Sequence, residues 1–157
     1  MQYIFMIKLP ISLLICLILF GCGTVNVQTV KKDIEGIRGH VSEQQGNVMP
    51  SKGKLSAKGS PIRTKIYVFE PTQLAQVQGL NGSICSKVNA LLLDSTSSDS
   101  TGNYFIALKP GKYTLLVKYE SGYFIPFFSG LNGLSMIQIQ PKRVSDLDII
   151  VNVKASY

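Results

Sequence analysis

The sequence predicts an all-β domain over residues 34–157, an antiparallel β-sandwich of about seven strands. Apolar and polar residues alternate in short segments, such as residues 37–41 and 146–153. Gly, Pro, Asn and Ser separate these segments, and no helical period of apolar residues is sustained. Alternation places every second side chain on one face of a sheet. Several such segments with regular turns are typical of a β-sandwich.

The amino-terminal half of this region predicts two strands and a long loop. The first strand covers residues 37–41, with Arg38 and His40 on its polar face. Residues 45–60 are rich in Gly, Lys, Ser and Pro, which predicts a loop. The next strand covers residues 64–70. Its two faces are both apolar, one with Ile66 and Val68 and one with Tyr67 and Phe69, so we expect it at the centre of a sheet.

The dipeptide Pro110-Gly111 predicts the turn of a hairpin. Residues 103–109 and 112–119 alternate regularly on either side of it. We expect the two strands to pair with each other because their connection is short. Tyr113 and Leu115 then point into the core.

The remaining segments complete the predicted sandwich. Residues 88–93 are apolar and precede a serine-rich turn over residues 94–99. Residues 136–140 form a short alternating strand, and residues 146–153 close the domain as one strand. In this last strand the expected inward side chains are Leu147, Ile149, Val151 and Val153.

Residues 99–115 carry a resemblance to a known family. Asp99-Ser100-Thr101-Gly102, an alternating strand and Pro110-Gly111-Lys112-Tyr113 resemble the carboxypeptidase regulatory-like domain family, as does the opening segment 36–41. The resemblance covers residues 34–157 and implies a transthyretin-like (prealbumin-like) sandwich, but no particular activity. In the turn, we expect Asp99 to bind its own following backbone and Gly102 to take a positive φ.

The amino terminus predicts a secretory signal. Lys8 precedes residues 9–20, which carry no charge and have the length of a signal-peptide core rather than of a membrane span. The run ends in Leu19-Phe20-Gly21-Cys22, which resembles the lipobox of bacterial lipoproteins. Either Met1 or Met6 is the start, and an uncleaved membrane anchor is the alternative to cleavage.

The lipobox resemblance implies a processing route and a location. Residues 1–21 are removed, Cys22 carries a diacylglyceryl group with palmitate-like chains, and residues 22–33 form a lipidated tether. Two acyl chains suffice for stable anchoring. Gly23 after the cysteine resembles lipoproteins of the outer membrane. The expected partner at this end is therefore a membrane of the bacterial envelope.

The charge distribution argues against a nucleic-acid partner. The formal net charge is +7, but the basic residues form small separate groups without interleaved aromatic residues. This pattern indicates a solvated surface or a mild attraction to anionic lipid headgroups. The groups lie at residues 31–32, 52–58, 63–65, 109–112 and 142–143.

Reactive side chains are few, so we expect no catalysis and no cofactor. Cys85 is the one cysteine left in the domain, which leaves no partner for an intrachain disulfide. His40 is the single histidine. His40 and Glu43 have the His-x-x-Glu spacing of a zinc pair, but they face opposite sides of a strand and a catalytic zinc needs a third protein ligand. A solvated serine-rich turn is also favoured over calcium binding near Asp99.

The apolar segment 123–128 contains the candidate residues for contact with a partner, Phe124, Phe127 and Phe128. Turn-forming residues bound it, and Pro126 excludes a central strand. The rings either cover one end of the core or remain exposed as a binding surface. The sequence thus predicts a non-catalytic interaction or structural module of the envelope that contacts a protein or glycan. The alternatives are a carrier of a small apolar ligand or glycan, and an enzyme that uses Cys85.

Overall fold

The computed structural model describes residues 34–49 and 59–156. The predicted signal segment 1–21, the lipidation site Cys22 and the tether 22–33 lie outside the described residues. All described residues belong to one compact unit, Asp33–Tyr157. Helical structure in this part of the chain is limited to a 3₁₀ turn, η2 (Leu74–Gln76). None of its helices has the length and apolar character needed to cross a membrane.

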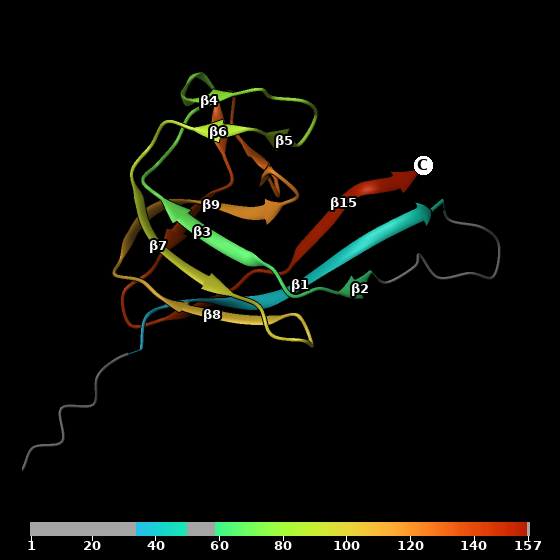
Figure 1. Cartoon of the computed structure of the whole chain (residues 1–157). Helices are drawn as coiled ribbons and strands as arrows, with labels where there is room; N and C mark the ends of the chain where they lie inside the picture. Colours follow the sequence, from blue (N-terminus) through green and yellow to red (C-terminus); the bar gives the residue numbers. More distant parts are fainter. Residues whose placement is uncertain (1–33, 50–58, 157) are drawn as a thin grey trace, which may run out of the picture. The chain divides into compact units, whose positions relative to one another are not determined.

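The all-β prediction is confirmed, because two main sheets account for most of the described residues (Figure 1). The first sheet contains β1 (Gly36–Asn47), β2 (Ser60–Pro61), β8 (Asn103–Ala107), β14 (Val144–Asp146) and β15 (Ile149–Ser156). The second contains β3 (Lys65–Phe69), β5 (Ile84–Cys85), β7 (Leu92–Ser97), β9 (Gly111–Tyr119), β10 (Gly122–Phe124) and β13 (Met136–Ile139). Two small sheets pair β4 (Val77–Gln78) with β6 (Lys87–Val88) and β11 (Phe128–Ser129) with β12 (Gly133–Leu134).

Strand β1 is the central strand of the first sheet. Its first half pairs antiparallel with β8, with Ile37 opposite Ile106. On the other side it pairs parallel with β14 and then with β15, where Val41 lies opposite Ile149. The first sheet is therefore mixed rather than purely antiparallel. Parallel neighbours need a long connection, and here most of the domain lies between β1 and β15.

Strand β9 is the central strand of the second sheet. It pairs with β3 on one side and with β10 and β13, one after the other, on its other side. Strand β3 lies between β9 and the edge strand β7. This confirms the central position that the two apolar faces of β3 predict.

The larger core cluster lies between the two main sheets. Strands β1, β8 and β15 contribute to it from the first sheet, and β3, β9, β10 and β13 from the second. The alternation of residues 103–109 is confirmed, because Tyr104, Ile106 and Leu108 are buried there. Leu115 is fully buried and Tyr113 packs against the same cluster from a half-buried position. A core shared by two sheets is consistent with a β-sandwich.

A second core cluster lies on the other face of β3 and β9. Phe69 and Leu116 contribute from that face, together with Cys85 of β5, Ile125 after β10 and Leu134 of β12. Tyr67 packs against this cluster as well, so the opposite directions of Ile66 and Tyr67 along β3 are confirmed. Strands β3 and β9 of the second sheet are thus covered on both faces.

The predicted hairpin around Pro110-Gly111 is wrong. Strand β8 pairs with β1 in the first sheet, whereas β9 pairs with β3, β10 and β13 in the second. The chain therefore crosses from one sheet to the other at this turn. The actual hairpin follows β9, where Tyr119 lies opposite Gly122 and Glu120 takes a φ of 47°. A hairpin of β8 with β9 and a crossing between the two sheets bury the same alternate side chains, so the alternation does not distinguish the two arrangements.

Two predicted loops are partly strand. Strand β1 continues to Asn47, inside the expected loop 45–60, because β15 supplies a pairing partner as far as Ser156. The expected serine-rich turn 94–99 is mostly strand β7, which pairs along β3. Strand β7 lies at the edge of the sheet and its side chains are mainly exposed. Both strands form because their backbones pair with a neighbouring strand. The polarity of their side chains does not indicate this pairing.

The expected closing strand 146–153 is interrupted. Strand β14 ends at Asp146 and β15 begins at Ile149. Ile149 and Val151 are buried as predicted, and Leu147 packs against the core, but Val153 is 39% exposed. The break allows Leu147 to donate its N–H to the Arg38 carbonyl at 2.8 Å.

Candidate functional site

The apolar segment 123–128 divides into a buried part and an exposed part. Phe124 is 1% exposed and belongs to the larger core cluster, and Ile125 is equally buried in the second. The Ile125 N–H donates to the Ser83 carbonyl at 2.8 Å. Phe124 is therefore a core residue, which corrects its assignment as a partner contact.

Ser135 fixes the position of Phe127, which is half-buried. The Phe127 N–H donates to Ser135 Oγ at 3.1 Å, and Ser135 returns two hydrogen bonds to the Phe127 carbonyl, from its N–H and its hydroxyl, each at 2.8 Å. Ser135 is fully buried and takes a φ of 39°, which non-glycine residues adopt rarely. These three bonds hold the backbone just before β11.

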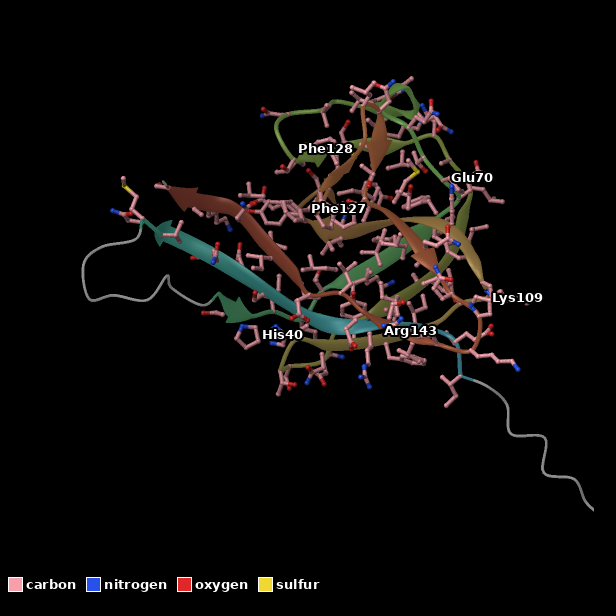
Figure 2. The ribbon with its side chains drawn as sticks, turned by 180° about the vertical axis from the view of Figure 1, so that it is seen from behind. His40, Glu70, Lys109, Phe127, Phe128 and Arg143 are labelled. Atoms are coloured by element: carbon pink, nitrogen blue, oxygen red, sulfur yellow. The ribbon has the colours of Figure 1, made fainter. Side chains whose placement is uncertain are left out.

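The hairpin of β11 and β12 exposes two large apolar side chains. Phe128 is 49% exposed and Leu131, in the turn, is 98% exposed. We call these two residues the apolar tip. Phe127 and Phe128 lie in the upper part of the molecule in Figure 2, away from Lys109 and Arg143. Of the three phenylalanines predicted as contacts, Phe128 is the most exposed.

Hydrogen bonds attach the hairpin to the rest of the domain. The Leu74 N–H donates to the Asn132 carbonyl at 2.8 Å, and the Leu134 N–H donates to the Thr72 carbonyl at 3.1 Å. Gly133 leaves no room for a side chain, because a Cβ there would lie 2.6 Å from the Ser129 carbonyl oxygen. A backbone held in this way presents the tip with little loss of conformational entropy on binding.

The apolar tip can bind by contact but offers no reactive group. Exposed aromatic and aliphatic anchors on a rigid support are typical of protein or lipid contacts. Sequence analysis did not single out Leu131. Its signal was available, since an apolar residue between Gly130 and Asn132 in a turn is unusual.

A second feature is an open, polar hollow of about 450 Å³ on the outer face of the first sheet. It is lined by Arg38, Gly39, His40, Asn103, Tyr104, Asp146 and Asp148. The Arg38 Nε donates to Asp146 Oδ1 at 2.6 Å, and the His40 N–H donates to Asp148 Oδ1 at 2.8 Å. The hydrogen bond from Arg38 lowers the pKa of Asp146, so this carboxylate is charged at neutral pH.

Tyr104 adjoins the hollow, but its ring is buried in the core between the main sheets. Its hydroxyl donates to the Leu147 carbonyl at 2.7 Å. Burial, and secondarily the charge of Asp148, raise the pKa of Tyr104 well above its ordinary value. The phenol therefore stays neutral and acts as a hydrogen-bond donor. The exposed polar groups of the hollow, from Arg38, Asp146 and Asp148, suit a hydroxyl-rich ligand better than an apolar one.

Cys85 and His40 are not brought together. Cys85 is fully buried in the second core cluster, whereas His40 lines the hollow on the first sheet. Burial raises the pKa of the Cys85 thiol, which keeps it protonated at neutral pH. Within residues 34–49 and 59–156, no group of three potential metal-ligating side chains is found.

The predicted Asx-turn at Asp99 is confirmed. Asp99 Oδ1 accepts hydrogen bonds from the Thr101 N–H at 2.8 Å, the Thr101 hydroxyl at 2.7 Å and the Asn103 N–H at 3.0 Å. The Thr101 hydroxyl contributes most to the lowered pKa of Asp99. Gly102 takes a φ of 82°, as expected, and lies against the Val41 carbonyl. This carboxylate thus stabilises the turn that leads into β8.

A scan against protein-family models gives no match, and a search of the curated proteins gives none either. The function is therefore inferred from the residues themselves.

Proposed function

We propose that this protein is a non-catalytic lipoprotein of the bacterial envelope, anchored through Cys22 and acting as an interaction or structural module. One observation carries this proposal, the order of Lys8, the uncharged residues 9–20 and Leu19-Phe20-Gly21-Cys22. A charged start, a short apolar run and a small residue before cysteine are what signal cleavage and lipid attachment require. Gly23 after the cysteine favours the outer membrane.

The proposal includes a finer fold assignment, a transthyretin-like sandwich of the carboxypeptidase regulatory-like family. Two features support it. The two main sheets share one core, and the Asp99 turn has the bonding that the Asp-x-x-Gly segment requires. In this assignment the sandwich is a rigid support for surface contacts.

The apolar tip is the proposed contact for an envelope protein or glycan. Phe128 and Leu131 are exposed on a hairpin that backbone hydrogen bonds hold in place. A second candidate, glycan binding, is favoured by the polar hollow around Arg38 and His40. Its open shape and charged lining do not favour a carrier of an apolar ligand.

Lipid attachment is tested by replacing Cys22. In cells fed an alkyne-labelled fatty acid, the native protein should incorporate the label and Cys22→Ser should incorporate none. The mutant should accumulate as unprocessed precursor, because the thiol that receives the lipid is absent. The matched control is Cys85→Ser, which leaves the proposed lipidation site intact. Full labelling of Cys22→Ser would contradict the proposal.

The contact is tested at the tip. We expect Phe128→Ala with Leu131→Ser to reduce the yield of crosslinked envelope partner about five-fold or more, since exposed anchors of this kind dominate binding energies. Melting should change little, because both side chains are largely exposed. Phe105, which is 44% exposed on β8, provides the matched control Phe105→Ala. Equal loss in both variants would show that the tip has no special role.

A further inference from the structure

The described chain begins between two loops at one end of the domain. The Leu108 N–H donates to the Glu35 carbonyl at 3.2 Å, and the Gly36 N–H donates to the Arg143 carbonyl at 3.3 Å. The segment before β1 is thus held between residues 108–112 and residues 140–143.

Four exposed basic side chains lie on these two segments. We call them the basic collar, and they are Lys109, Lys112, Lys142 and Arg143. Figure 2 shows Lys109 and Arg143 at the end where the described chain begins. The two pairs are separated by about thirty residues of sequence, and the start of β1 brings them together through the hydrogen bonds just described.

The collar keeps a net positive charge when its acidic neighbours are included. Glu35 is the carboxylate between the loops, and its Oε1 accepts the Lys142 N–H at 2.7 Å. Arg143 also helps to lower the pKa of Asp146, but the main partner of this carboxylate is the Arg38 side chain, which neutralises its charge. Among the described residues of these segments, four cations therefore lie beside one carboxylate, that of Glu35.

The chain that joins this end to Cys22 is short. Eleven residues lie between Cys22 and Ile34, a span of at most about 40 Å when fully extended. Lys31, Lys32 and Asp33 are among them, so this segment carries a formal charge of +1. An anchor at Cys22 holds the collar end of the domain within reach of the bilayer, and clusters of four or more basic residues in such a position are attracted to anionic headgroups.

We propose that the basic collar docks on the anionic lipid headgroups of the membrane that holds Cys22. The inference rests on the proposed lipid anchor and adds an orientation to it. With the collar on the bilayer, Phe128 of the apolar tip, which lies in the upper part of Figure 2, faces away from the membrane. Lipid, rather than nucleic acid or an acidic protein, is the partner because the described chain begins beside the collar and the proposed anchor Cys22 is only eleven residues away from Ile34 in sequence.

Amine labelling of the mature lipidated protein tests this orientation. The protein is reconstituted in vesicles of phosphatidylcholine alone or with about 30% phosphatidylglycerol, an anionic lipid. Labelling of Lys109, Lys112 and Lys142 should slow about five-fold or more in the anionic vesicles. Added salt at about 0.5 M should restore it, since salt screens exposed charges. Lys87, on β6 at the other end of the domain, is the internal control and should label equally in both (Figure 1).

A charge-removal variant completes the test. With Lys109→Gln, Lys112→Gln and Arg143→Gln combined, Lys142 should label in anionic vesicles as fast as in neutral ones. The matched variant Lys87→Gln should leave the protection of Lys142 unchanged. Equal labelling of the collar in both vesicle types, on protein whose Cys22 carries lipid by mass spectrometry, would overturn the docking and leave the proposed function intact. A Cys22 without lipid would overturn the proposed function, and this orientation with it.

Discussion

Replacing Gly39 by alanine is expected to destabilise the domain by about 3 kcal/mol or more. An added Cβ would lie 1.9 Å from the carbonyl oxygen of Leu147 and 2.5 Å from its carbonyl carbon. Both are backbone atoms at the break between β14 and β15, and Leu147 is also bonded to Arg38 and Tyr104. The backbone would have to move and these bonds would weaken, because no flexible side chain can give way.

Chemical denaturation of Gly39→Ala, followed by circular dichroism, measures this loss. Gly111→Ala is the control, since its Cβ would meet only the Tyr113 ring, at 3.3 Å or more. That variant should retain nearly the native free energy of unfolding. A native-like Gly39→Ala would mean that the Leu147 carbonyl does not approach β1 as closely as described.

Replacing Leu115 by alanine is expected to lower the free energy of unfolding by about 2–5 kcal/mol. Leu115 is fully buried at the centre of β9, opposite Val68 of β3, and packs in the core between the main sheets. Alanine removes these contacts and leaves a cavity that two sheets cannot readily close. The melting temperature should fall on the order of 10 °C.

Differential scanning calorimetry measures the melting temperature of Leu115→Ala, and the matched control is Leu91→Ala. Leu91 is 62% exposed just before the edge strand β7, so the same chemical change there should cost less than about 0.5 kcal/mol. If both variants melt with the native protein, Leu115 does not lie in the core.

Sequence alternation correctly predicted which side chains are buried along several strands. On β3, Ile66 and Val68 face the main core while Tyr67 and Phe69 face the second cluster. A strand turns successive side chains to opposite faces whatever its neighbours are. The Asx-turn at Asp99 was equally predictable, because a carboxylate, two following N–H groups and a glycine form it locally.

The functional residues were only partly predictable. Phe124 and Phe128 belong to one apolar segment, yet the first is in the core and the second is half exposed. Both residues are phenylalanines, so their polarity does not separate them. Phe124 is buried because it lies in β10, which pairs with β9. Likewise, Lys109 and Arg143 are far apart in sequence and become neighbours because Glu35 and Gly36 bond to both loops.

The sequence by itself determined the all-β class, the alternating faces and the Asp99 turn, since each depends on neighbouring residues. It also carries the lipidation signal proposed at Cys22. The tertiary structure alone decided which strands pair. Strand β8 joins β1 rather than β9, and β15 runs parallel to β1, although inward and outward side chains are the same in either arrangement. Backbone hydrogen bonds between distant segments decide pairing, and every residue except proline carries the same N–H and C=O groups for them.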